Sequence, residues 1–215
     1  MYALKLASCK KILGQKTVFS GLQAELEGLV LGIAGDNGSG KSTLVKCLVG
    51  LLTLDEGSAE IWRLGEDPGV MKLTRGTFGV SAPWMNAYPE LSVMENLSFL
   101  ADLQGFDALN NRTEPNGHTE STPQNTFGLS NEDLAKPVGS LSSGQQQKAR
   151  LMLANAFTPE VLFLDEPDSH LDETSIEHLH EWISERKKHS KLTIMASNQP
   201  RELALCDGVL TLSNE

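Results

Sequence analysis

The chain is poor in the residues that would place it outside the cell or inside a membrane. Its three cysteines, Cys9, Cys47 and Cys206, are widely spaced and odd in number. Such a set argues against a disulfide framework and against a zinc site, and it favours a cytosolic compartment. No run approaches the roughly 18 unbroken apolar residues of a membrane span. The N-terminal apolar stretch is also too short for a signal peptide.

Positive charge is scarce as well. The 215 residues carry 18 Lys and Arg against 28 Asp and Glu, a formal net charge of −10. Because binding to a nucleic-acid backbone needs a positive face, this balance argues against nucleic acid as a partner. With 40% hydrophobic and 21% charged residues, the composition predicts a globular protein with one good core and an appended lobe. Residues 110–125 contain no aliphatic side chain and predict a mobile surface loop.

Glycine, by contrast, is concentrated in one informative run. Residues 35–42 read Gly-Asp-Asn-Gly-Ser-Gly-Lys-Ser, which matches the phosphate-binding pattern G-x-x-x-x-G-K-[ST]. Glycines let the backbone turn its N–H groups toward anionic oxygens. Lys41 supplies a cation for the β- and γ-phosphates, and the Ser42 hydroxyl is suited to Mg²⁺. We therefore assign nucleotide binding to Gly35, Asp36, Asn37, Gly38, Ser39, Gly40, Lys41, Ser42 and Thr43.

The context of this run favours a genuine phosphate loop over a chance glycine turn. The apolar residues 29–34 read as a buried strand, and residues 42–51 carry apolar side chains at helical spacing. The loop would then open a helix whose N-terminal dipole faces the phosphates. The bare pattern occurs by accident in about one chain in a hundred of this length, and the strand and helix lower that chance further.

A second motif places two acids after another buried strand. Residues 161–164 are apolar and are followed directly by Asp165 and Glu166. In a parallel sheet, the carboxyl ends of strands form the edge at which ligands bind. Asp165 is then suited to hold Mg²⁺, and Glu166 to polarise a water that attacks the γ-phosphate. The alternative is a pair of solvated strand-end acids.

The remaining periodicity predicts an α/β doubly wound core, because strands alternate with helices. The expected strands cover residues 2–6, 17–26, 57–62, 78–80, 192–196 and 208–212, and the further helices begin near 95 and span 143–157 and 176–186. The two N-terminal strands alternate loosely, as antiparallel strands do. Residues 78–80 read as a core strand.

Between the two phosphate motifs, residues 141–145 read Leu-Ser-Ser-Gly-Gln, a polar helix start with Ser142 or Ser143 as its cap. In this position the run resembles the signature sequence of ABC-type ATPases. Residues 169–172 resemble the D-loop of that family, and residues 88–97 resemble the segment that opens its helical subdomain. The resemblance covers nearly the whole chain. Ser143 stands where the family commonly has glycine.

The resemblance implies a P-loop NTPase (RecA-like) core with a small antiparallel β subdomain and an inserted α-helical subdomain. Residues 1–215 would form one ABC ATPase domain, with the ATP-binding core in residues 1–82 and 153–215. Residues 83–152 would form the helical signature subdomain, which includes the loop at 110–125.

The resemblance also implies a mechanism. Two such domains close head to tail around two molecules of Mg²⁺–ATP, so that each nucleotide lies on the phosphate loop of one subunit. The opposite subunit, a second copy or a paralogue, covers it with Ser142, Ser143, Gly144, Gln145 and Asp172. Hydrolysis would power a separate membrane-spanning subunit, and the chain would sit on the cytoplasmic face of the membrane. Compact size and the short spacing from Trp84 to Glu95 are most similar to the heme-exporter ATPases of cytochrome c maturation.

Three departures from the family touch the nucleotide. Residues 11–14 hold no aromatic side chain to stack on adenine, and no glutamine follows Val80. Asn198 stands where the family has its switch histidine. Asparagine can donate a hydrogen bond but cannot carry positive charge. Since the loss of one donor matched to a transition state costs about 2.7–4 kcal/mol, we expect a slow ATPase with Asn198 in a catalytic position.

Two other functions remain open from the sequence. One is a soluble non-transport ABC ATPase of the iron–sulfur assembly type, which is also a single soluble domain. The other is a degenerate module that uses ATP only to dimerise; the three departures favour it, whereas intact Lys41, Asp165 and Glu166 oppose it. Trp84 likewise has two interpretations, an exposed anchor for a membrane subunit or a partly buried core residue.

Overall fold

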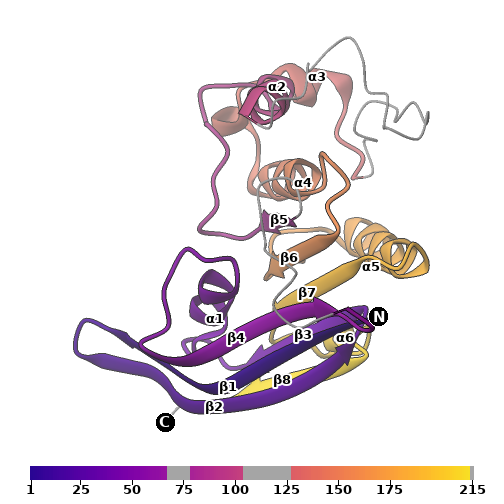
Figure 1. Cartoon of the computed structure of the whole chain (residues 1–215). Helices are drawn as coiled ribbons and strands as arrows, with labels where there is room; N and C mark the ends of the chain where they lie inside the picture. Colours follow the sequence, from indigo (N-terminus) through magenta and orange to yellow (C-terminus); the bar gives the residue numbers. More distant parts are fainter. Residues whose placement is uncertain (67–77, 104–126, 214–215) are drawn as a thin grey trace.

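The computed structural model describes residues 1–66, 78–103 and 127–213, so the loop expected over 110–125 lies outside the described residues. Figure 1 shows two sheets with helices between and above them. The strands are β1 (Tyr2–Leu13), β2 (Lys16–Gly28), β3 (Val30–Gly35), β4 (Glu56–Arg63), β5 (Phe78–Ser81), β6 (Val161–Asp165), β7 (Leu192–Ser197) and β8 (Gly208–Leu212). The helices are α1 (Lys41–Leu48), α2 (Val93–Leu103), α3 (Asn131–Ala135), the 3₁₀ helix η1 (Val138–Ser140), α4 (Ser143–Ala154), α5 (Glu173–Lys188) and α6 (Pro200–Leu203).

The larger sheet has five parallel strands in the order β5-β6-β7-β3-β8. This order differs from the chain order, because β7 lies between β3 and β6. The carboxyl ends of three neighbouring strands therefore meet at one edge of the sheet, where ligands bind in open α/β folds. That edge receives the phosphate loop after β3, Asp165 and Glu166 at the end of β6, and Asn198 after β7.

Side chains of this sheet alternate between two cores, as the two-residue period of a strand requires. On β6, Val161 and Phe163 join the first hydrophobic cluster, whereas Leu162 and Leu164 join the second. The first cluster includes α1 and the three-stranded sheet, and the second includes α4 and α5. Both faces of the sheet are thus covered, which explains why β6 is entirely buried.

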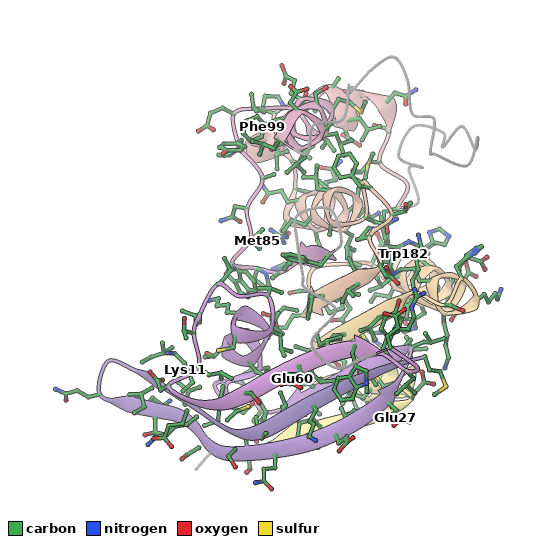
Figure 2. The ribbon with its side chains drawn as sticks, in the orientation of Figure 1. Lys11, Glu27, Glu60, Met85, Phe99 and Trp182 are labelled. Carbon is green, nitrogen blue, oxygen red and sulfur yellow. The ribbon has the colours of Figure 1, made fainter. Side chains whose placement is uncertain are left out.

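The smaller sheet is antiparallel, in the order β2-β1-β4, and it packs over α1 (Figure 1). Lys11 ties this sheet to the chain after α1. Its ammonium donates a hydrogen bond to the Thr53 carbonyl at 2.7 Å and pairs with the Asp55 carboxylate at 3.1 Å. Figure 2 labels Lys11 toward one end of this sheet and Glu27, on β2, toward the other, with Glu60 of β4 between them.

Helices α2, α3 and α4 form a separate lobe at the top of Figure 1, which we call the helical lobe (residues 93–103 and 127–154). It joins the parallel sheet where α4 meets β5. A Cβ added to Gly79 would lie 1.9 Å from the Ala154 carbonyl oxygen, so only glycine permits this approach. Within the described ranges, no helix combines the length and apolarity needed to cross a membrane.

Several expected boundaries are wrong. Helix α1 ends at Leu48 rather than residue 51, because Gly50 adopts a φ of 76° and turns the chain away. Helix α4 ends at Ala154 rather than residue 157, because the chain must turn through Thr158 and Pro159 to enter β6. Strand β5, expected in the core, is the edge strand of the parallel sheet.

Candidate nucleotide-binding site

The first half of the site is the phosphate cradle, which we define as residues 35–43 between β3 and α1. Gly40, directly before α1, has a φ of 100°, and a Cβ there would lie 2.7 Å from Val18. Gly35 has a φ of 147°, and its Cβ would meet the Leu212 carbonyl and the Ser39 hydroxyl at 2.5 Å each. Side chains at either position would therefore be strained and crowded. The cradle is a tight backbone turn at a helix N-terminus, the geometry that suits an anion.

Lys41 supplies the positive charge of the cradle. It is 4% exposed, and its ammonium donates hydrogen bonds to the carbonyl oxygens of Gly35 at 2.7 Å and Asp36 at 3.0 Å. No carboxylate in the described ranges pairs with it. A buried cation held only by carbonyl dipoles is well placed to receive an anionic ligand.

The second half of the site is the acidic edge, which we define as Asp165, Glu166 and Asn198. The Glu166 N–H donates to the Ala196 carbonyl of β7 at 2.9 Å, and Glu166 has a φ of 50°. A positive φ is unusual for a residue with a side chain and is common at functional turns. Asp165 is fully buried, and its Oδ2 accepts a hydrogen bond of 2.7 Å from the indole Nε1 of Trp84.

Asn198 joins the acidic edge to the cradle. Its side-chain amide donates to Asn37 Oδ1 at 3.2 Å. The preceding residue, Ser197, is buried at the end of β7 and donates its hydroxyl to the carboxyl group of Glu202 on α6. Burial raises the pKa of Glu202 to about 7. A buried carboxyl thus supports the strand end that carries Asn198.

Residues of the cradle and one member of the acidic edge, Glu166, line a pocket of about 340 Å³, whereas Asp165 and Asn198 are not among its lining residues. It is lined by Leu13, Lys16, Val18, Asn37, Gly38, Gly40, Lys41, Ser42, Thr43 and Glu166. The pocket therefore brings Glu166 to the phosphate loop from 123 residues further along the chain (166 − 43 = 123). Lys16 and Val18, on β2, are members that the sequence motifs did not indicate; only the antiparallel pairing of β2 with β1 carries them there.

The residues present fit a divalent cation. Asp165 Oδ1 is buried and has no hydrogen-bond partner among the described residues. A buried carboxylate oxygen without a partner is costly unless a cation or a bound water satisfies it. Carboxylate and hydroxyl oxygens are the ligands that Mg²⁺ prefers, and Asp165 and Ser42 offer one of each.

The signature residues lie elsewhere. Ser142 caps α4 in a capping box: its hydroxyl accepts from the Gln145 N–H at 3.3 Å, and the Gln145 side chain accepts from the Ser142 N–H at 2.9 Å. Ser142 and Ser143 are exposed. Together with Gly144 and Gln145 they stand outside the phosphate-loop pocket. The cap is present as the sequence indicated, with Ser142 rather than Ser143 as the capping residue.

Asp172 is also outside that pocket. It caps α5, and its Oδ1 accepts from the Ser175 N–H at 2.8 Å. This hydrogen bonding lowers the pKa of Asp172. Lys148 of α4 lies 3.7 Å from its other oxygen. An ion pair therefore links α4 to the N-terminal cap of α5 within one chain.

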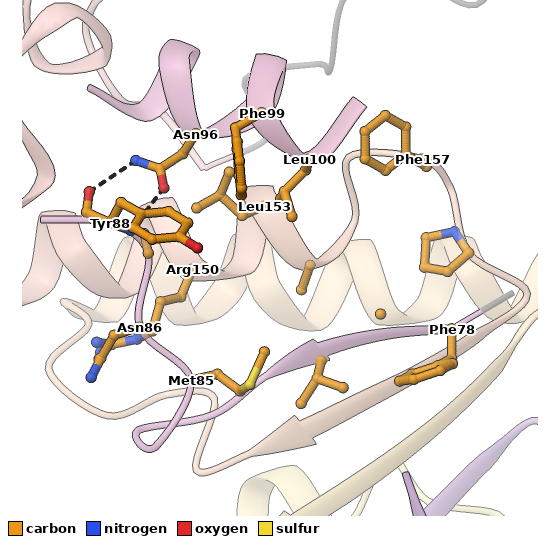
Figure 3. Close-up of a pocket in the computed structure, with 15 residues that line it drawn as sticks. Phe78, Met85, Asn86, Tyr88, Asn96, Phe99, Leu100, Arg150, Leu153 and Phe157 are labelled. Atoms are coloured by element: carbon orange, nitrogen blue, oxygen red, sulfur yellow. Dashed lines mark hydrogen bonds between the residues drawn. The ribbon is translucent and has the colours of Figure 1, made fainter. Parts of the chain in front are cut away.

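A second, apolar pocket of about 230 Å³ lies between β5 and the helical lobe (Figure 3). Met85 and Tyr88 approach from the segment that joins β5 to α2, and Phe99 approaches from α2. Tyr88 is fixed by Asn96, whose side chain accepts from the Tyr88 N–H at 2.8 Å and donates to its carbonyl at 3.1 Å. Met85 and Tyr88 are 41% and 53% exposed. No sequence motif indicated this pocket, because its walls come from four segments.

Of the two interpretations of Trp84, the structure agrees with a partly buried core residue. The side chain is half-buried, packs against the first hydrophobic cluster and bonds Asp165. The parallel pairing of β5 with β6 explains its position, because the chain leaves β5 beside the end of β6. The sequence could have indicated the contact between Trp84 and Asp165 only if it had been known that β5 and β6 are neighbours in the sheet.

Comparison with known proteins agrees with this geometry. Residues 24–169 match the family model described as ABC transporter. A probable sulfate/thiosulfate import ATP-binding protein CysA of Chlorella vulgaris is 35% identical over 78% of this chain and 66% of its own length. A ribose import ATP-binding protein RbsA of Bacillus licheniformis is 32% identical over 97% of this chain but 43% of its own length. The chain thus spans two thirds or less of these two relatives.

In other comparisons, this chain matches a larger share of the other protein. The ABC transporter ATP-binding protein NatA of Bacillus subtilis is 30% identical over 86% of this chain and 74% of its own length. A solved dimeric bacterial ABC transporter cassette has a TM-score of 0.77 at 17% identity, over 98% of this chain and 94% of that one. A dimeric post-hydrolysis cassette bound to ADP and phosphate has a TM-score of 0.77 at 19% identity, over 97% and 94%. Likenesses this distant show the fold, and the family match over more than half of the sequence shows that the chain belongs to the ABC transporter family.

Proposed function

We propose that this chain is the ATP-binding and ATP-hydrolysing subunit of an ABC transporter and powers a separate membrane subunit from its cytoplasmic face. The observation that carries the proposal is the single pocket in which a buried, unpaired Lys41 faces Glu166 across a phosphate cradle. A cation alone would bind many anions. A carboxylate beside the bound phosphates adds the base that hydrolysis requires.

Binding of the triphosphate would use the cradle. The backbone N–H groups at the start of α1 and the Lys41 ammonium would hold the β- and γ-phosphates. Ser42 and Asp165 would hold Mg²⁺, which neutralises charge on the phosphates when bound. The exposed side chain of Leu13 lines the same pocket and offers an apolar contact to adenine in place of an aromatic ring.

Hydrolysis would use the acidic edge. Glu166 would accept a proton from the attacking water while that water approaches the γ-phosphate. Asn198 would orient the water or the phosphate through its amide, which donates a hydrogen bond to Asn37 in the lining of the pocket. Because an amide carries no charge, the stabilisation of the transition state would be weaker than with a cation, and we expect slow turnover.

The chain would act as a head-to-tail pair with a second copy or a paralogue. Ser142, Ser143 and Gly144 are at the N-terminus of α4, a position suited to a phosphate, yet they lie outside the pocket of their own chain. A nucleotide contact for them therefore requires a second subunit. Asp172, which is paired with Lys148 beside this helix, would lie at the same interface. The solved cassettes with this fold are described as dimeric.

The apolar pocket of Figure 3 would receive the membrane subunit. Its wall includes Arg150, which is half-buried and donates two hydrogen bonds to the neutral side chain of Gln147. Burial lowers the pKa of Arg150, and no carboxylate in the described ranges pairs with it. We therefore expect the occupant to be an apolar segment of the membrane subunit that carries one acidic residue. The transported substrate would be set by that subunit.

Steady-state ATP turnover of the purified chain with Mg²⁺ tests the proposal. Glu166→Gln should lower turnover about 10²- to 10⁴-fold without changing nucleotide affinity, because only the base is lost. Glu177→Gln, on the exposed face of α5, is the matched control and should leave turnover unchanged. Unchanged turnover in the Glu166 variant would contradict the proposal.

Asn198 favours a second candidate function, a module that uses ATP only to dimerise. Asn198→His separates the two. In a slow ATPase this change should raise turnover by about tenfold or more, since it restores a donor that can carry charge. A chain with no measurable turnover in either form, but with ATP-dependent dimerisation in sedimentation, would be the dimerisation module instead.

A further inference from the structure

Trp84 makes a contact that the proposed chemistry leaves unused. Its indole Nε1 donates to Asp165 Oδ2 at 2.7 Å, although the two residues are 81 positions apart in the chain. The ammonium of Lys46, on α1, lies 5.0 Å from the centroid of the same ring. One half-buried side chain therefore bridges the helix that follows the phosphate cradle and the strand that carries the acid.

The fold explains why the indole reaches this carboxylate. Ser81, the last residue of β5, pairs with Leu164, so the chain leaves β5 directly beside Asp165. A turn follows, closed by the hydrogen bond from the Met85 N–H to the Ala82 carbonyl at 3.0 Å. Packing of the ring against the first hydrophobic cluster then restricts its orientation.

The indole hydrogen bond makes the two carboxylate oxygens of Asp165 different from each other. Oδ2 accepts the indole hydrogen bond, whereas Oδ1 is buried and has no partner among the described residues. Indole is a donor only, so it can neither ligate a cation nor accept a proton from the carboxyl group. What it can do is fix the rotation of the carboxylate, leaving one chosen oxygen for another ligand.

We propose that Trp84 is the positioning residue of the metal site: its indole N–H holds Asp165 Oδ2, so that Oδ1 is presented to the divalent cation that accompanies the nucleotide. This proposal rests on the proposed Mg²⁺–ATP site. Without the indole bond, the carboxylate would rotate among several orientations, and part of the metal-binding free energy would be lost in ordering it. Lys46 over the ring opposes movement of the indole itself.

The test is the Mg²⁺ concentration at half-saturation of nucleotide binding, measured by calorimetry with a non-hydrolysable ATP analogue. Trp84→Phe keeps an aromatic ring and removes the N–H. We expect its Mg²⁺ midpoint to rise about tenfold, the size of one hydrogen bond to a charged group. Affinity for the analogue in EDTA should stay unchanged, because metal-free binding uses the cradle alone. A purely structural tryptophan would lower both affinities together.

Two further variants separate failure of this proposal from failure of the site. Trp182→Phe makes the same substitution on α5, in the second hydrophobic cluster, and should not move the Mg²⁺ midpoint. Asp165→Asn should raise the midpoint by more than Trp84→Phe does. If Asp165→Asn has no effect, the metal assignment to Asp165 is wrong. If Asp165→Asn raises the midpoint and Trp84→Phe leaves it within twofold, the role proposed for Trp84 is wrong.

Fluorescence gives an independent readout with Trp84 intact, should Trp84→Phe fail to fold. In the double variant Trp62→Phe, Trp182→Phe, only Trp84 emits. A cation bound to Asp165 changes the charge next to the indole, so Mg²⁺ added to the analogue-loaded protein should shift the emission, with the midpoint found by calorimetry. Emission that does not respond to saturating Mg²⁺ would overturn the proposal.

Discussion

The phosphate cradle and the acidic edge meet at one pocket, where Glu166 lies beside the cradle, yet they are built in different ways. The cradle is a continuous stretch, residues 35–43, whose shape follows from glycines in unusual backbone conformations. The acidic edge collects side chains from β6 and from the end of β7, and Trp84 buttresses it from beyond β5. Binding of phosphate is thus a local property of the chain, whereas placement of the acid and metal ligand depends on three neighbouring strands. Substitutions in the cradle should lower nucleotide affinity. Substitutions in or beneath the acidic edge should change Mg²⁺ binding and the stability of the fold.

The largest effect is expected from a substitution in the phosphate cradle. Lys41→Met removes the only buried cation of the cradle, and we expect nucleotide affinity to fall about 10²- to 10³-fold, because a charge-assisted contact in a desolvated position is worth several kcal/mol. Calorimetry measures it. Lys16→Met is the control: Lys16 lines the same pocket but is exposed, so its loss should change affinity by less than about threefold. Equal losses in both variants would contradict the special role of Lys41.

The next effect concerns the support of the acidic edge by Glu202, and it appears as a dependence of stability on pH. Glu202 supports Ser197 at the end of β7, and burial raises its pKa from 4.5 to about 7. The folded chain therefore binds more protons than the unfolded chain between these values, so stability falls as pH rises through that window. The expected loss between pH 4.5 and pH 8 is about 3 kcal/mol. Asp168 and Arg201 also influence this group.

Glu202→Gln isolates the contribution. Glutamine keeps the shape of the side chain and does not titrate, so the free energy of unfolding of this variant should fall less with pH than that of the original chain. Urea denaturation at pH 5 and pH 8 gives both values. Identical pH dependence in the two proteins would show that Glu202 is not the responsible group.

The smallest effect tests a local feature of the helical lobe. Ser142→Ala removes the cap of α4 and should lower the free energy of unfolding by about 1 kcal/mol. Ser143→Ala is the matched control, because Ser143 is also exposed but is the first residue of α4 rather than its cap. Denaturation of the two variants compares them directly. A larger loss from Ser143→Ala would contradict the assignment of the cap.

Prediction from the sequence worked best where the signal is short in range. Strand β8 was expected over residues 208–212 and has those bounds, and the cap of α4 was confined to two adjacent serines. Helix ends were less well predicted, because α1 and α4 end where the chain must turn toward its next strand. The position of β5 at the edge was also missed, since an apolar triplet does not encode strand order.

By itself, the sequence determined the phosphate cradle, because glycine conformations and a lysine at fixed spacing act over a few residues. It also named Asp165 and Glu166 as strand-end acids. Only the tertiary structure decided that β7 lies between β3 and β6, and hence that Asn198 reaches Asn37 across 161 positions. It likewise decided that Trp84 faces Asp165. Such contacts depend on which strands become neighbours, and that choice is made by burial of both faces of the sheet at once.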